Sequence, residues 1–213
     1  MNPNTQYSTL AVPATRRFDY WKEVVCRHCL AADSKPLSQS RFDGSLTLNT
    51  VGALDICTLS SPLHYWERSE QHLRSGPAED LWLGFARKGH GQIEQGSRKA
   101  NLATGNLFLY DATQAFRFSL GGTENHLIRI PRALITERLP RIAEYTAMVL
   151  DDRRPGVVPL REMLQEARWL TRGLSMRYDT LLRTARVIIE RQAAFLVNGD
   201  ESMAPLTLKE VAD

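Results

Sequence analysis

Short apolar runs separated by turn residues dominate the middle of the chain, from Asp80 to Pro131. Turn residues interrupt the runs at 89–91, 95–97 and 104–106. These residues tolerate a positive φ or close a turn through their own side chain. Short strands at this spacing are typical of an antiparallel barrel or sandwich. The expected strands are 81–87, 92–95, 98–102, 107–110, 116–120 and 127–130.

Further alternating segments precede this region and add strands to the barrel. Phe42, Leu46 and Leu48 alternate with polar residues, and 54–59 alternates again. The following segment, 64–74, is rich in aromatic and charged residues, which fits a lid over a ligand cavity and fits a solvated connection equally well.

A helix with a pair of cysteines is expected before the strands. Thr15 can cap this helix, whose apolar face carries Phe18, Trp21, Val25 and Cys29. Cys26 and Cys29 form a CxxC pair, a spacing found in redox pairs and in zinc sites. A structural zinc site needs four ligands, and the sequence has no second pair to complete one. We therefore interpret the cysteines as core residues.

Helical periodicity returns after the strands. Pro131 begins a helix that Pro140 interrupts and that continues to Val149. Apolar residues at helical spacing then predict two longer helices, 160–174 and 180–197, which would form an antiparallel hairpin. The expected fold class is α+β, an antiparallel β-barrel followed by a C-terminal helical hairpin.

Three segments carry a resemblance to a known family: FDYWKEVV at 18–25, TGNLFLYD at 104–111 and LIRIPRAL at 127–134. They resemble the N-terminal regulatory domain of AraC/XylS-type transcription activators. The resemblance implies a cupin-like barrel followed by helices, and a helix-turn-helix DNA-binding half that this sequence lacks. The expected domains are a loose arm at 1–14, a helix and effector-sensing barrel at 15–131, a helical dimerisation region at 132–199, and at 200–213 a linker with the truncated start of the DNA-binding domain.

Composition narrows the function classes. The 213 residues suffice for one full core and an appendage. No apolar run approaches the roughly 18 residues of a membrane helix, and the polar N-terminus does not resemble an export signal. The odd number of cysteines, 3, argues against a disulfide framework. We therefore expect a cytoplasmic protein with no membrane partner. A net charge of +3 is not the concentrated basic surface of a nucleic-acid binder.

The sequence nominates no catalytic machinery. His90 lies alone between glycines, with Glu94 on the same segment. Two ligands do not make a divalent-metal site of useful affinity. None of the usual nucleophile, phosphate-binding or zinc-protease motifs is present. We expect no catalytic residue, no metal and no cofactor.

A barrel cavity with aromatic walls and a few polar groups is the usual small-molecule site. Both faces of each strand are partly apolar, so the pattern does not decide which face lines the cavity. Each aromatic residue could equally be plain core, and Arg129 could equally point outward to a glutamate. The candidate effector-binding residues are Trp82, Phe108, Tyr110, Phe116, Phe118, His126, Arg129 and Arg74.

The predicted helical hairpin carries an apolar stripe wide enough to pack on the barrel and on a partner. On its other face arginines alternate with Glu190, which favours a homodimer contact over a DNA-reading helix. The candidate interface residues are Leu164, Leu181, Leu182, Ala185, Ile188 and Ile189.

A capping box at 207–210, the start signal of a helix, stands three residues before the chain ends. A segment this short does not hold a helix in water, so the natural polypeptide, or its ancestor, is expected to have continued. The resemblance then implies the effector-sensing and dimerisation domain of a bacterial AraC-type transcription regulator. Its partners would be a small-molecule effector and a second copy of the chain, with DNA bound only through a C-terminal domain absent here. The alternatives are a stand-alone cupin-type small-molecule enzyme without a tightly bound metal, and a truncated regulator acting as a protein-interaction module.

Overall fold

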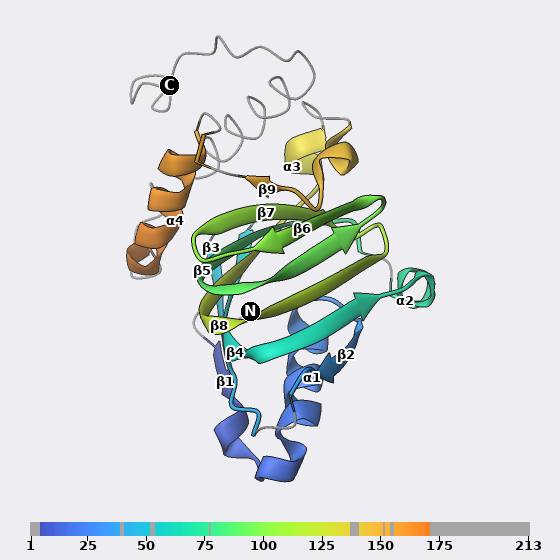
Figure 1. Ribbon diagram of the computed structural model, residues 1–213, viewed down its shortest axis with the longest axis vertical. Coiled ribbons are helices and arrows are strands. Elements are labelled where there is room, and N and C mark those ends of the chain that lie inside the picture. The colour runs from blue at the N-terminus through green and yellow to red at the C-terminus, as the bar shows by residue number, and fades with distance from the viewer. Residues whose placement is uncertain are drawn as a thin grey trace.

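Figure 1 shows the computed structural model, which describes residues 5–38, 41–51, 54–76, 78–136, 141–150, 152–153 and 156–170. Within these residues one antiparallel sheet has nine strands in the order β1-β3-β4-β8-β5-β7-β9, with β2 paired to β4 and β6 paired to β5. The strands are β1 (Thr5–Ser8), β2 (Asp33–Pro36), β3 (Ser45–Val51), β4 (Leu54–Arg68), β5 (Leu81–Gln95), β6 (Arg98–Leu102), β7 (Asn106–Asp111), β8 (Phe116–Ile130) and β9 (Val149–Leu150). The α-helices are α1 (Arg17–His28), α2 (Glu70–Ser75), α3 (Ala133–Thr136) and α4 (Val157–Leu170), and the 3-10 helices are η1 (Thr9–Ala11), η2 (Ala14–Arg16) and η3 (Ile142–Tyr145). The predicted antiparallel architecture is confirmed.

The three central strands β4, β5 and β8 are each 15 residues long, whereas a typical strand has about six. The sequence predicted separate strands at 81–87 and 92–95, and at 116–120 and 127–130. That prediction is wrong, because β5 and β8 each run continuously through their glycines. The two halves of these strands fold over each other and form two facing walls. Phe108 of β7, which pairs with the first half of β5, therefore contacts Phe118 of β8 on the other wall, with ring centroids 5.7 Å apart.

Glycines permit this bend because the two strands approach too closely there for a side chain. A Cβ on Gly91 would lie 1.9 Å from the carbonyl oxygen of Ser119, and one on Gly121 would lie 2.5 Å from the Cα of Leu63. Gly122 has a φ of +134°, which disfavours other residues. The pairing register of β5 with β8 also shifts beside these glycines. The segment 89–91 is therefore a bend within a strand and not a turn between strands.

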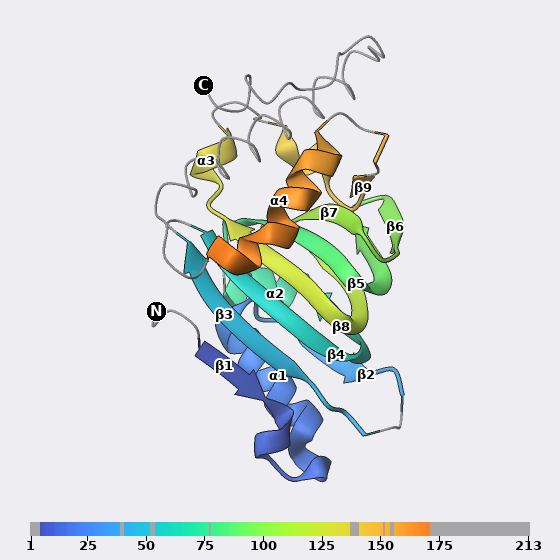
Figure 2. The same ribbon diagram turned by 90° about the vertical axis from the view of Figure 1, so that its left-hand side faces the viewer.

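Two apolar cores lie on opposite faces of the sheet. The inner core contains Trp82, Phe108 and Phe118. The outer core contains the alternate residues of the same strands, such as Leu83 and Phe85, and α3, η3 and α4 cover it. Figure 2 shows α4 lying across this outer face. Residues of β5 therefore alternate between two buried environments, which explains why both faces read as apolar in the sequence.

Helix α1 closes the open side of the inner core, and Trp21, on the predicted apolar face of this helix, is 1% exposed. Its indole Nε1 donates a hydrogen bond of 2.9 Å to Nε2 of His64 on β4. His64 Nδ1 lies 2.9 Å from the carbonyl oxygen of Pro62. Because that carbonyl can only accept, Nδ1 carries the proton and Nε2 is free to accept from Trp21. The hydrogen bond thus ties α1 to the neutral form of His64.

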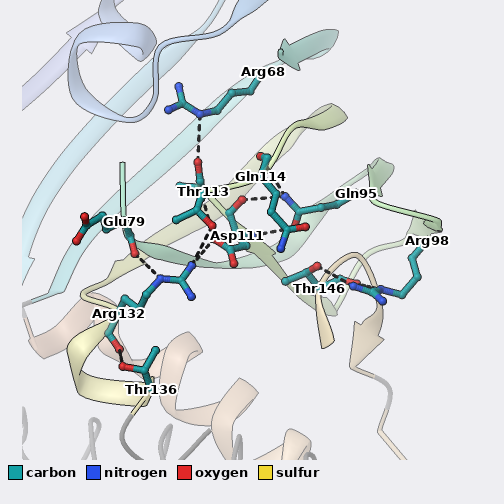
Figure 3. Close-up of polar contacts among 11 residues, drawn as sticks. Arg68, Glu79, Gln95, Arg98, Asp111, Thr113, Gln114, Arg132, Thr136 and Thr146 are labelled. Atoms are coloured by element: carbon teal, nitrogen blue, oxygen red, sulfur yellow. Dashed lines mark hydrogen bonds and ion pairs between the residues drawn. The ribbon is translucent and has the colours of Figure 1, made fainter. Parts of the chain in front are cut away.

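Buried polar contacts close one end of the barrel (Figure 3). The side chain of Gln95, at the end of β5, accepts from the backbone N–H of Asp111 at 2.9 Å and donates to its carbonyl at 2.8 Å. The Asp111 carboxylate, 1% exposed, pairs with Arg132. Arg68 donates to the backbone carbonyls of Ala31, Gly76 and Ala112. These contacts join the ends of β4, β5 and β7 to one another and to the neighbouring loops.

Segments outside the central strands differ from the expectations in several places. Residues 5–8, predicted within a loose arm, form β1 because they find a pairing edge on β3. Residues 64–68 continue β4, and only 70–75 form a separate helix. Val149, predicted to be helical, lies in β9 and pairs with Phe108 of β7. In each case the backbone pairs with an edge that local periodicity does not reveal.

The predicted helical hairpin is only partly covered by the described residues. α4 corresponds to its first helix. The second helix, 180–197, and the linker at 200–213 lie outside the described residues. None of the described helices is long and apolar enough to span a membrane.

The His64 hydrogen bond predicts a pH-dependent stability. Burial lowers the pKa of His64 from 6.5 to about 4. Above pH 6.5 the imidazole is neutral in both the folded and the unfolded chain. As the pH falls toward 4 the unfolded chain gains a proton that the folded chain excludes, so the free energy of unfolding should fall by roughly 3 kcal/mol. Urea unfolding followed by tryptophan fluorescence at several pH values measures this loss.

Other carboxyl groups also titrate in this range, so the test compares variants. His64→Gln retains an acceptor for Trp21 without titrating and should remove roughly that share of the pH dependence. His90→Gln is the matched control, since His90 is exposed, and it should behave as the parent chain does. If the free energy of unfolding depends on pH equally in all three proteins, the prediction is contradicted.

Candidate functional site

Five of the predicted effector-binding residues form one aromatic cluster in the inner core. Trp82 of β5 stacks on Tyr110 of β7 with ring centroids 6.1 Å apart. Tyr110 contacts Phe116 at 5.2 Å and Phe118 at 6.0 Å. Phe108 lies over Gly84, where a Cβ would be 2.0 Å from its ring. The structure therefore brings together aromatic residues from three strands, all of them buried.

A small cavity of about 40 Å³ lies beside this cluster. Tyr110, Phe116 and Phe118 line its wall, and Trp82 and Phe108 belong to the same core behind them. The other wall comes from α1 and the loop after it, including Val25, Cys29 and Leu30. The volume is well below the roughly 300 Å³ at which small-molecule sites begin. Residues of α1 and of the loop after it thus form one wall of a cavity too small for an organic ligand.

Thiol and phenol groups give the inner core some polarity. The Sγ atoms of Cys29 and Cys57 lie 3.4 Å apart, so Cys29 has Cys57 as its near partner rather than Cys26 of the CxxC pair. The hydrogen bond to Cys57 raises the pKa of Cys29 well above its ordinary value, and burial adds to this. Burial likewise raises the pKa of Tyr110. Cys29 and Tyr110 are therefore neutral hydrogen-bonding groups at physiological pH, and the Cys29 thiol is a poor nucleophile.

Two further polar groups in the inner core escaped the sequence analysis. The indole Nε1 of Trp82 and both amide atoms of Asn125 are buried without a hydrogen-bond partner among the described residues. Asn125 pairs with Leu59 across β4 and β8, which places it on the same face as Leu127. The sequence contained one indication of this position, because Asn125 is two residues from the apolar Leu127 and therefore on the same face of the strand. Buried polar groups are normally hydrogen-bonded, so the Trp82 N–H and the Asn125 amide can each offer a hydrogen bond to a bound molecule.

Arg129 lies on β8 directly beside Trp82 of β5. Its guanidinium pairs with Asp55 and lies 3.8 Å from the carboxylate of Asp80. The side chain is 41% exposed. Arg129 is therefore placed at the edge of the aromatic cluster with its charge already balanced by aspartates, rather than by a glutamate on a covering helix.

The remaining two candidates lie away from the aromatic cluster. His126 stacks on Phe85 of the outer core, with ring centroids 5.9 Å apart. Its alternation with Leu127 puts it on the opposite face of β8 from the cluster, so His126 and Arg129 could not both reach one cavity. Arg74 is exposed on α2.

The dimer candidates are only partly described. Leu164 of α4 is 5% exposed and packs in the outer core of its own chain. The other candidates, Leu181, Leu182, Ala185, Ile188 and Ile189, lie outside the described residues. Leu134 of α3 and Val158 of α4 are 41% and 39% exposed, respectively.

No metal centre is found in the part of the chain that the structure describes. There, no group of three or more His, Cys, Asp or Glu residues lies close enough together to hold a metal ion. His90 is exposed on β5, and Glu94 is paired with Lys99 of β6.

Curated proteins similar to this chain include RNA polymerase sigma-54 factors. That of Acidithiobacillus ferridurans is 48% identical over 54 residues, which are 25% of this chain and 11% of the relative. That of Rhodobacter capsulatus is 38% identical over 121 residues, which are 54% of this chain and 27% of the relative. The chain therefore spans only a small part of these relatives.

Among solved structures, the AraC-like transcriptional activator CuxR matches with a TM-score of 0.77 over 98% of this chain and 82% of that protein, at 18% identity. This match shows a shared fold. The family model of the AraC-binding-like domain matches residues 21–188. That range includes the aromatic cluster, α1 from Trp21 onward and α4. The chain therefore belongs to the AraC-binding-like domain family.

Proposed function

We propose that this chain is the effector-sensing and dimerisation domain of a bacterial AraC-type transcription regulator. One observation carries the proposal, namely an inner core with a multi-strand aromatic cluster and buried, unpartnered polar groups on Trp82 and Asn125. Such a site offers stacking surfaces and directional hydrogen bonds to a small molecule. Membership of the AraC-binding-like domain family supports the assignment to a regulator. The protein would act in the cytoplasm as a binding protein without catalysis.

Effector entry requires α1 to move. The cavity of about 40 Å³ is too small for an organic effector, and one of its walls is formed by Val25 of α1 and by Cys29 directly after the helix. The Trp21–His64 hydrogen bond holds the helix in place. In the proposed mechanism the effector displaces α1 from the aromatic cluster and satisfies Trp82 Nε1 and Asn125. Arg129, with its two aspartates, would stand at the edge of the enlarged site.

The proposed domain organisation separates effector binding from dimerisation. The segment 15–131 holds the effector-binding barrel, and 132–199 forms the dimerisation region. Leu164 packs against the barrel of its own chain. The contact with the partner would therefore be made by the other candidate interface residues of the hairpin, together with the exposed Leu134 and Val158. DNA would be contacted by a helix-turn-helix domain outside this chain, an expectation that rests on the family resemblance.

The effector site predicts a selective loss of ligand stabilisation. A metabolite that raises the melting temperature of the parent chain should fail to do so in Trp82→Phe, which loses the indole N–H, and in Phe108→Leu, which loses the stacked ring. Differential scanning fluorimetry with a metabolite panel measures the shifts.

The matched control is Phe85→Leu, because Phe85 lies on the same strand, is equally buried and faces the outer core. This variant should lose comparable stability while keeping the ligand shift. If every shift survives both inner-core substitutions, the proposed site is wrong. Chemical conversion of a stabilising metabolite on incubation with the parent chain, followed by mass spectrometry, would instead favour the enzyme alternative.

The dimerisation region predicts a homodimer without sequence-specific DNA affinity. Sedimentation equilibrium at micromolar concentration should give the mass of two chains. Leu182→Glu should give a monomer, while Glu190→Gln, on the polar face of the same predicted helix, should leave the dimer intact. Gel-shift assays with promoter fragments should show no competitor-resistant complex. A monomeric parent chain would remove the dimer claim, and a resistant complex would identify the helical hairpin as a DNA-binding element.

A second candidate function is binding to RNA polymerase. The identity to sigma-54 factors, 48% over 54 residues, is far higher than the 18% shared with the structurally similar activator. This segment supports the alternative of a protein-interaction module, which could coexist with effector binding.

The second candidate predicts direct binding of the full chain to purified core RNA polymerase. Sigma-54 factor should compete for the same surface, whereas serum albumin should not. Biolayer interferometry measures both. Absence of binding, or binding that sigma-54 factor does not displace, would contradict the second candidate and leave the effector proposal intact.

A further inference from the structure

A second concave surface lies on the outer face of the sheet, where β3, β4 and β8 meet α4. This groove has a volume of about 400 Å³, which falls within the range of small-molecule sites. Five hydroxyl side chains contribute to its lining: Ser45, Thr47, Thr58, Ser60 and Thr123. The groove is thus ten times larger than the cavity in the inner core and has the opposite chemical character.

The strand register arranges these hydroxyl groups in pairs. Ser45 of β3 lies opposite Ser60 of β4, and Thr47 lies opposite Thr58. Adjacent strands are about 4.8 Å apart, and alternate residues along one strand are about 6.8 Å apart. The hydroxyl groups therefore form a regular array, in which each can both donate and accept a hydrogen bond.

Charged groups at the edge of this array are unusually buried for the polar face of a sheet. Glu124 is 8% and His126 is 5% exposed. Thr58 Oγ1 lies 3.0 Å from Nδ1 of His126, and His126 Nε2 lies 3.4 Å from the Glu124 carboxylate, which also pairs with Arg87. An ordinary solvated face leaves its ionisable groups in water. Here they are linked to one another, so the orientation of the Thr58 hydroxyl is held before any ligand arrives.

The remaining lining residues restrict the ligand further. Ile56, Ile128 and Leu164 add aliphatic surface beside the hydroxyl array. The lining within the described residues contains no lysine or arginine, and the Glu124 charge is already met by Arg87. Neither an anion nor a cation would find an uncompensated opposite charge. A molecule with many hydroxyl groups and an aliphatic C–H face matches both parts of the surface.

We propose that this groove binds a neutral, hydroxyl-rich small molecule, a sugar or polyol, between the sheet and α4. The site lies on the opposite face of the strands from the aromatic cluster, so it is distinct from the proposed effector site. Because Leu164 belongs to both the groove and the outer core, the ligand would contact the helix that leads out of the barrel.

Titration of the full 213-residue chain with glucose, trehalose and myo-inositol tests the proposal. Saturation-transfer NMR is the suitable readout, since sugars raise melting temperatures without binding. At least one of the three should bind saturably. Thr47→Val and Thr58→Val keep the side-chain shape and remove one hydroxyl each, so each should raise the Kd roughly tenfold.

The matched control is Thr50→Val, which makes the same change on β3 at a residue outside the groove lining. It should bind as the parent chain does, and so should Trp82→Phe in the inner core. The proposal is overturned if none of the three compounds saturates the parent chain, if Thr47→Val and Thr58→Val both retain the parent Kd, or if Thr50→Val weakens binding equally.

Discussion

The bend of the long central strands is the constraint on which the rest of this structure depends. At Gly91 and Gly121 the backbones approach so closely that a Cβ would overlap the neighbouring strand. Only this approach lets one strand contribute to both walls of the barrel. The aromatic residues of the two walls, such as Tyr110 and Phe116, then meet across the interior. The narrowness of the interior is a direct consequence of the same bend.

A narrow interior makes helix α1 part of the binding site as well as part of the fold. The helix completes the inner core through Trp21, whose side-chain hydrogen bond to neutral His64 links α1 to β4. Among the described residues, buried polar atoms of Trp82 and Asn125 in the same core have no hydrogen-bond partner. A bound molecule that paired with them would gain affinity from those hydrogen bonds. Under the proposed function, these hydrogen bonds would favour the movement of α1 when an effector binds.

The opposite faces of the same strands serve different purposes. The outer face is apolar where the C-terminal helices cover it, and hydroxyl-rich where β3 and β4 leave it open. On β8, His126 contributes to the outer groove and Arg129 to the edge of the inner core, three residues away. Ligands on the two faces would therefore act on the same sheet without sharing a side chain. Leu164 of α4 borders the groove, so a ligand there would contact a helix of the proposed dimerisation region directly.

The sequence by itself determined the antiparallel class, the N-terminal helix and the aromatic set centred on Tyr110, because alternation and helical periodicity are local properties. It did not determine which strand face is inside, since a sheet covered on both faces alternates between two apolar environments. The sequence pattern also predicted a turn between two strands at Gly91. In the structure the chain only bends there within one strand, because the neighbouring strand passes too close for a side chain. Only the tertiary structure decided three further features: the partner of Cys29, the pairing of β1, and the separation of His126 from Arg129. The first two depend on residues distant in sequence, and the third depends on which face of the strand is buried where.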